Sequence, residues 1–226
     1  MDPTYSLVII GAVICMIASA NVNRAFRKYS RYGSKRGITG AQAAQQILND
    51  AGIYDVQIRH ISGDLTDNYN PGNKTLNLSD SVYGSTSIAA VGVAAHECGH
   101  AIQHNVGYMP IKIRGAIVPV VNLGSKLSWP VIILGVILGS FNMLNIGILL
   151  FALTLVFQIV TLPVEFNASH RALRILGEQG ILSDSELPYT RKVLKAAALT
   201  YVASAAAAIL QLLRLVLLFG GRNRDD

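Results

Sequence analysis

The chain has 226 residues, of which 51% are hydrophobic and only 14% are charged. Its mean hydropathy of +0.41 excludes an ordinary soluble globule of this length and indicates a protein of the lipid bilayer. The net charge is +6, but the basic residues flank apolar runs, as the topology signals of membrane proteins do. We therefore expect a bilayer, and no nucleic acid, as a partner. The two cysteines, Cys15 and Cys98, suggest no disulfide framework.

Residues 5–20 form the first predicted membrane span. Six basic residues lie between positions 24 and 36, whereas only Asp2 precedes the span. The positive-inside rule therefore puts the N-terminus outside and the following segment in the cytoplasm. The basic stretch also fits a solvated amphipathic helix on the membrane surface, and both interpretations can hold together. Because no basic stretch precedes the span and no small-residue cleavage site follows it, we expect no cleaved signal peptide.

Residues 24–112 are predicted to form a small cytoplasmic lobe of mixed α and β structure. A capping box at residues 39–42 predicts a helix over residues 40–49. Residues 54–58 alternate in polarity as a strand does, and residues 74–78 have the pattern of a half-buried strand. We expect the free edge of this second strand to bind an extended peptide by β-augmentation.

An H-E-x-x-H motif occupies residues 96–100, inside the apolar and helix-like run 88–101. His96 and His100 are one helical turn apart, so both imidazoles project from nearly the same face and can share one zinc ion. Glu97 is turned by about 100° from the first histidine. It is poorly aimed at the metal but can reach a water on the metal, take its proton and later pass that proton to a leaving amine.

The motif has a simpler interpretation as a solvated helix face. Its apolar flanks argue against that interpretation, because two imidazoles and a carboxylate buried without a metal or partners would cost several kcal/mol. Cys98 lies about 200° round the helix from His96, and we interpret it as a small core residue. His104 follows His100 at too short a distance for the third histidine of a metzincin, so we assign it to the surroundings of the metal or to the helix surface.

Three further spans are predicted at residues 113–140, 143–163 and 196–219, each from its apolar composition. The first two form a hairpin around a tight turn at residues 141–142. Together with residues 5–20, these three segments make four spans. An even number of spans places both termini on the same side, which is the outside. Lys126 fits either a position at the membrane interface or one in the bundle interior, where an ionisable group would mark function.

A catalytic zinc usually takes three protein ligands and leaves a fourth position for water. The cytoplasmic segment 164–195 offers Glu165 or His170 as the third ligand. Glu165 directly follows an apolar span and needs a partner there, which the H-E-x-x-H helix would supply. The alternative is an interfacial ion pair of this carboxylate with Arg171 or Arg174. His170 lies about 140° round the helix from Glu165 and ranks second.

Residues 91–103, with the sequence VGVAAHECGHAIQ, and residues 162–169, with the sequence LPVEFNAS, resemble the neutral zinc metallopeptidases of bacterial membranes, the YugP type. The resemblance covers nearly the whole chain, including the order of the spans, and so implies a single membrane metallopeptidase domain over residues 1–226. More distantly, the chain is similar to membrane gluzincins related to the CAAX-prenyl endopeptidases and to the heat-shock membrane protease. Those proteins carry an Asp four residues after the zinc-binding Glu, where this chain has Ser169.

The resemblance implies a mainly α membrane bundle with a zincin-like lobe, a Zn²⁺ cofactor held by His96, His100 and Glu165, and Glu97 as the catalytic acid and base. It does not supply a substrate. A serine adds no negative charge to the surroundings of the metal, so those surroundings must differ from the distant relatives.

The sequence therefore predicts a zinc endopeptidase that cleaves membrane or membrane-proximal proteins at the cytoplasmic face of a cell membrane. A zinc-binding scaffold without proteolysis is the first alternative, although such a site needs no base like Glu97. A small transporter with a buried metal site is the second alternative, but the sequence has no evident inverted repeats or pairs of broken helices to support it. The sequence does not decide whether the chain forms a homo-oligomer or binds another membrane protein. The candidates for stabilising the oxyanion are Tyr69, Tyr83, His170 and Arg171.

Overall fold

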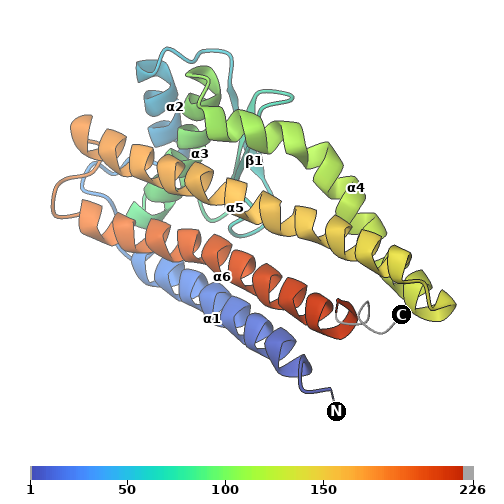
Figure 1. Ribbon diagram of the computed structural model, residues 1–226. Helices are drawn as coiled ribbons and strands as arrows, with labels where there is room; N and C mark the ends of the chain where they lie inside the picture. Colours follow the sequence, from blue (N-terminus) through green and yellow to red (C-terminus); the bar gives the residue numbers. More distant parts are fainter. Residues whose placement is uncertain (1, 221–226) are drawn as a thin grey trace. The chain divides into compact units, whose positions relative to one another are not determined.

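The computed structural model describes residues 2–220 and is mainly helical (Figure 1). Its helices are α1 (Tyr5–Tyr29), α2 (Gly40–Asp50), α3 (Ile88–Asn105), α4 (Met109–Leu138), α5 (Phe141–Glu178) and α6 (Leu187–Phe219), and its strands are β1 (Gln57–Ile61), β2 (Asn68–Asn70) and β3 (Thr75–Ser79). The predicted class, a mainly α protein with a small sheet, is confirmed.

The chain divides into two compact units. The helical unit comprises Met1–Ser19, Lys112–Leu162 and Thr200–Asp226, and the mixed unit comprises Ala20–Ile111 and Pro163–Leu199. All three strands, α2 and α3 belong to the mixed unit, whereas the four long helices contribute residues to both units. The chain therefore passes between the units within continuous helices.

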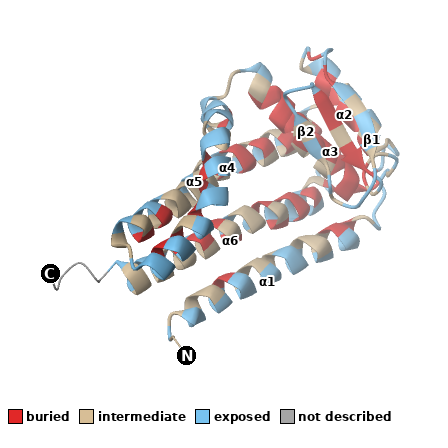
Figure 2. Cartoon of the chain, turned by 90° about the vertical axis from the view of Figure 1, so that its right-hand side faces the viewer, coloured by how far each residue is buried: buried red, intermediate tan, exposed pale blue. Residues whose placement is uncertain are grey.

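Four helices of the described chain, α1, α4, α5 and α6, are long and apolar enough to cross a bilayer. Each of them covers all or most of one predicted span. Large apolar side chains on them are exposed, such as Ile17 at 65%, Leu138 at 67% and Leu149 at 68%. The exposed residues recur along these helices in Figure 2. Such surfaces are stable against lipid and costly in water.

The long helices extend beyond the predicted spans. Helix α1 continues to Tyr29, into the first part of the basic stretch, and α6 already begins at Leu187. Arg, Lys and Ala are good helix formers, so a helix does not have to end where its apolar run ends. The apolar run therefore sets the span but not the helix boundary.

The turn between α4 and α5 lies at Gly139 and Ser140, not at residues 141–142 as predicted. Gly139 adopts φ +63°, a left-handed conformation that glycine enters without a Cβ penalty. The carbonyl oxygen of Ser140 accepts a hydrogen bond from the backbone N–H of Leu144 at 3.1 Å, so α5 starts directly after it. The prediction missed the glycine as the end signal of α4.

Small residues allow close helix contacts inside the helical unit. A Cβ at Gly11 on α1 would lie 3.3 Å from the Cα of Ala207 on α6. A Cβ at Gly147 on α5 would lie 2.5 Å from Cγ1 of Ile132 on α4. This packing of small residues is typical of helices that associate in lipid.

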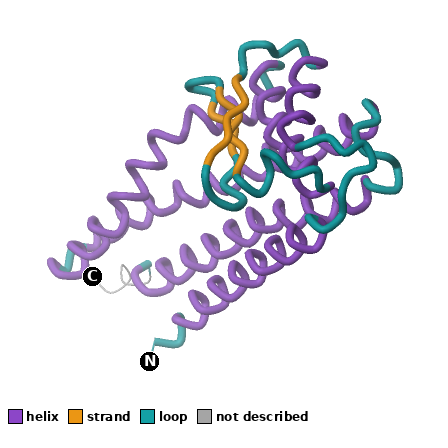
Figure 3. The backbone as a smooth tube through the Cα atoms, turned by 180° about the vertical axis from the view of Figure 1, so that it is seen from behind, coloured by secondary structure: helices purple, strands orange, loops and turns teal. Residues whose placement is uncertain are grey.

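The strands of the mixed unit lie side by side in one sheet (Figure 3), and their order is β1-β3-β2. Strand β1 pairs with β3 in parallel, and β2 pairs with β3 antiparallel, with Tyr69 opposite Leu76. The predicted strand at residues 74–78 is therefore the central strand, and it is buried at both ends rather than half buried. The expectation that its free edge binds a peptide is wrong, because both edges are already paired. The strand predicted at residues 54–58 lies a few residues later, at β1.

Helices α2 and α3 pack together against the sheet and form the core of the mixed unit. The capping box is confirmed: Oγ1 of Thr39 accepts from the backbone N–H of Gln42 at 3.1 Å, and Oε1 of Gln42 accepts from the backbone N–H of Thr39 at 2.9 Å. Buried residues cover most of α3 in Figure 2. This burial fixes the position of α3 within its unit.

Candidate metal centre

Helix α3 carries the H-E-x-x-H residues in the interior of the mixed unit. Its N-terminus is capped by Ser87, whose Oγ accepts from the backbone N–H of Ala90 at 3.2 Å. Glu97 and His100 are only 8% and 9% exposed. The interpretation of the motif as a solvated helix face is therefore wrong.

Gly99 brings α3 and α5 close together beside the motif. A Cβ at this position would lie 2.8 Å from the carbonyl oxygen of Ala168 and 3.2 Å from its Cα. A larger residue would push the backbone of α5 away, since helix backbone atoms cannot move as a flexible side chain does. Gly99 thus permits the contact that brings Glu165 to the histidines.

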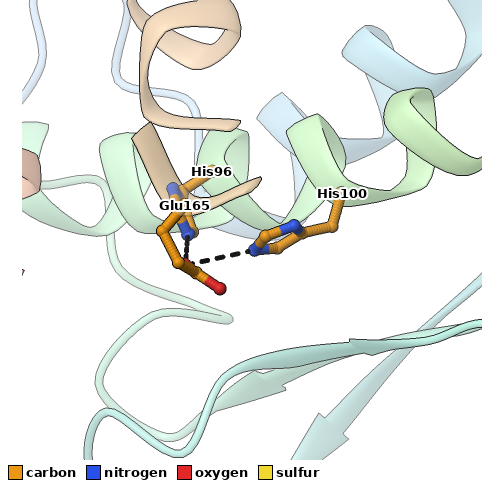
Figure 4. A group of neighbouring side chains, drawn as sticks. All are labelled: His96, His100 and Glu165. Carbon is orange, nitrogen blue, oxygen red and sulfur yellow. Dashed lines mark ion pairs between the residues drawn. The ribbon is translucent and has the colours of Figure 1, made fainter. Parts of the chain in front are cut away.

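The structure brings His96, His100 and Glu165 to one point (Figure 4). Oε2 of Glu165 lies 3.3 Å from Nε2 of His96 and 3.5 Å from Nε2 of His100. The two imidazole rings are nearly perpendicular, at 85°, with centroids 4.8 Å apart. Glu165 is 2% exposed, so all three groups meet in a largely dry environment.

This arrangement fits a tetrahedral zinc ion. Ligand atoms about 2.0–2.1 Å from zinc in a tetrahedron are about 3.3 Å from one another. The two distances between the carboxylate oxygen and the imidazole nitrogens match that spacing. Two imidazoles and one carboxylate also form a ligand set that zinc hydrolases use with an open fourth position. The residues present therefore fit Zn²⁺.

Gln103 orients His100 and was missed by the sequence analysis. Nε of Arg171 can only donate, and it donates to Oδ1 of Asn167 at 2.7 Å. This contact determines which end of the Asn167 amide is the oxygen. The side-chain amide of Gln103 then donates to the same oxygen at 3.0 Å and to the carbonyl oxygen of Val164 at 2.8 Å.

Consequently, Oε1 of Gln103 faces Nδ1 of His100, at 3.1 Å. We assign the donating N–H to Nδ1 on this basis, which leaves the lone pair of Nε2 toward the cluster. The sequence does contain a signal for this contact, namely spacing: Gln103 follows His100 by about one helical turn and lies on the same helix face.

Ser169 contacts Nδ1 of His96, as Gln103 contacts Nδ1 of His100. Its Oγ lies 3.1 Å from Nδ1 of His96. The serine therefore occupies the place expected for the Asp of the distant relatives, as a neutral hydrogen-bond partner. Ligand histidines commonly use their second nitrogen in this way, and the contact holds the ring orientation.

Glu97 is placed beside the cluster without belonging to it. Burial raises the pKa of its carboxyl above the usual value, and the carboxylates of Glu165 and Asp67 raise it further, although both histidines of the motif act in the opposite direction. A carboxylate with a raised pKa accepts a proton more readily, which suits a general base near neutral pH.

The other candidate ligands lie outside the cluster. Among residues 2–220, the three-residue cluster is the one group that could hold a metal. Cys98 is fully buried, and its thiol donates to the carbonyl oxygen of Ala44 at 3.6 Å, so its assignment to the core is confirmed. The ring of His104 packs at 5.6 Å from that of Tyr69. His170 is exposed and lines a cavity to which none of the three cluster residues contributes.

The remaining candidates are dispersed over the structure. Arg171 bonds to Asn167, and its guanidinium lies 5.8 Å from the ring of Tyr108. Arg174 pairs with Glu178 at 3.9 Å. Each of the two arginines therefore has a partner other than Glu165, with which the ion-pair alternative would pair it. Tyr83 packs against His60. Lys126 is exposed on α4, which argues against the interior position considered for it.

Fold and site together define a mainly helical protein with four helices that could cross a membrane and a buried cluster of two histidines and a glutamate that could hold a metal. The sequence profile of the family described as "Putative neutral zinc metallopeptidase" matches residues 4–220, and the chain belongs to this family. It is 44% identical over 209 residues to the "Putative membrane protease YugP" of Bacillus subtilis, covering 92% of this chain and 93% of that protein. No solved structure matches the chain significantly.

Proposed function

We propose that the chain is a zinc-dependent endopeptidase of the cell membrane, with several spans, that cleaves membrane or membrane-proximal proteins at the cytoplasmic face. The observation that supports this most strongly is the buried cluster of two imidazoles and a carboxylate at tetrahedral spacing. Membership of a family described as zinc metallopeptidases agrees with it.

In this proposal His96, His100 and Glu165 hold the metal, and Gln103 and Ser169 hold the two histidines in orientation. When bound, zinc supplies a Lewis acid that lowers the pKa of a coordinated water toward ~7. Glu97 takes the proton from the attacking water and delivers it to the leaving amine, in agreement with its buried position.

We assign the substrate path to β2 in place of β3. Strand β2 is an edge strand of the sheet, and it contacts α3. Its Tyr69 packs on His104, one turn beyond His100, so an extended peptide along β2 would pass the cluster. Tyr69 is therefore the strongest of the oxyanion candidates.

The decisive experiment compares wild-type chain with Glu97→Gln in detergent, using an unfolded membrane protein as substrate. Glu97→Gln keeps shape and metal but removes the base, so proteolysis should fall by about 10²–10⁴-fold while zinc stays near one ion per chain. Glu178→Gln, at an exposed carboxylate of α5, is the matched control and should keep full activity. Near-wild-type activity of Glu97→Gln would refute the mechanism. Zinc retention without proteolysis by the wild type would favour the scaffold.

A further inference from the structure

A cavity of about 560 Å³ lies between α5 and α6 within the mixed unit. Four basic side chains line it: His170 and Arg174 from α5, and Arg191 and Lys195 from α6. On each helix the two are four residues apart and therefore project from one face toward the cavity. No acidic side chain lines the cavity in the described part of the chain, although Glu178, one turn further along α5, pairs with Arg174 at 3.9 Å. The positive charge of these side chains favours an anion as the ligand.

The rest of the cavity wall is apolar. Phe166 and Leu173 of α5 and Leu194 and Ala198 of α6 contribute to it. A soluble anion such as free phosphate makes no use of such a wall, whereas burial of a hydrocarbon chain gains about 0.8 kcal/mol per CH₂ in general. The cavity therefore combines the two surfaces that an anionic amphiphile needs.

The lining residues nearest the predicted spans along the chain are apolar. Phe166 closely follows the apolar run predicted as a span at residues 143–163, and Ala198 lies inside the run predicted at residues 196–219. Arg174 and Arg191 are farther from those runs. On α5 the lining ends at Arg174, whereas on α6 basic and apolar side chains alternate as far as Leu187.

We propose that this cavity binds one anionic phospholipid, its phosphate between the four basic side chains and an acyl chain along the apolar wall. Arg and Lys bind phosphate oxygens through charge-assisted hydrogen bonds. Ser169 also lines the cavity, and its hydroxyl contacts Nδ1 of His96. The bound lipid would therefore lie one side chain away from the metal cluster.

The test uses the full chain, purified and delipidated in a neutral detergent. Binding is measured by native mass spectrometry and by the shift in Tm, with phosphatidylglycerol, phosphatidylcholine or inorganic phosphate as the added probe. We expect wild-type chain to retain one phosphatidylglycerol and to be stabilised by it. Phosphatidylcholine and inorganic phosphate should each give a much smaller shift.

Arg191→Gln and Lys195→Gln should each weaken phosphatidylglycerol binding by about tenfold, the usual effect of losing one charge-assisted hydrogen bond. The matched control is Lys192→Gln, which removes the same charge from the next residue of α6, outside the cavity, where its Nζ lies 5.6 Å from the ring of Tyr189. It should bind as the wild type does.

Three results would overturn the proposal. Equal losses in Lys192→Gln and Arg191→Gln would mean a diffuse surface charge rather than a site. Stabilisation by inorganic phosphate as strong as that by phosphatidylglycerol would reduce the cavity to an anion site. Unchanged binding in both cavity variants would place the lipid elsewhere.

Discussion

Oε1 of Gln103 lies 3.1 Å from Nδ1 of His100, and the amide of the same side chain donates to α5 at the carbonyl oxygen of Val164. Gln103 is fully buried. One side chain therefore fixes the orientation of a proposed ligand and joins the helix of the two histidines to the helix of Glu165. The candidate metal centre is therefore built from both helices, which this contact joins.

Replacing Gln103 by Met should lower zinc affinity by about 10–100-fold, because loss of the partner of a ligand histidine commonly has that effect. Zinc affinity is measured by competition with a chelator, and cooperative thermal unfolding shows that the fold persists. Gln45→Met on the exposed face of α2 is the matched control. Wild-type affinity in Gln103→Met would show that the contact does not position the histidine.

The third ligand is tested by comparing Glu165→Ala with His170→Ala. Only Glu165 meets both histidines, so its loss should remove most of the bound zinc, whereas His170→Ala should keep it. Metal content per purified chain is the measurement. The opposite pattern, with zinc lost in His170→Ala, would reverse the assignment made from the structure.

Much of the site was predictable, because its signals are local. The spacing of His96 and His100 places them on one helix face, and Glu165 stands out as a carboxylate beside an apolar run. Gln103 was not predicted, since its role depends on a tertiary contact with α5. The same limit applies to the sheet: alternation located β3, but only the pairing of strands distant in sequence makes it the central strand.

Gly99→Ala tests the approach of α3 and α5. The added methyl would meet backbone atoms of Ala168, and overpacking of this kind typically costs about 1–3 kcal/mol. We expect a lower Tm together with weaker zinc binding, because α5 also carries Glu165. Gly115→Ala on α4 has no atom within 4 Å of the new methyl and is the control. It should be neutral or stabilising by about 0.5–1 kcal/mol, the usual gain for Gly to Ala inside a helix. Equal behaviour of the two variants would contradict the close approach.

The proposed cytoplasmic position of the candidate metal centre is tested by cysteine labelling in a background with Cys15→Ala and Cys98→Ala. Tyr54 is 80% exposed in the mixed unit, so Tyr54→Cys reports on the side where that unit lies. Asn142→Cys, exposed at the start of α5, reports on the hairpin end that the positive-inside rule puts outside.

An impermeant maleimide should label only Asn142→Cys in intact cells and only Tyr54→Cys in sealed inverted vesicles. This pattern is expected because the basic residues that follow the first apolar run resist translocation and keep the attached chain in the cytoplasm. Labelling of Tyr54→Cys from outside intact cells would reverse the topology. The proposed substrates would then be proteins at the outer face, while the proposed metal ligands would stay the same.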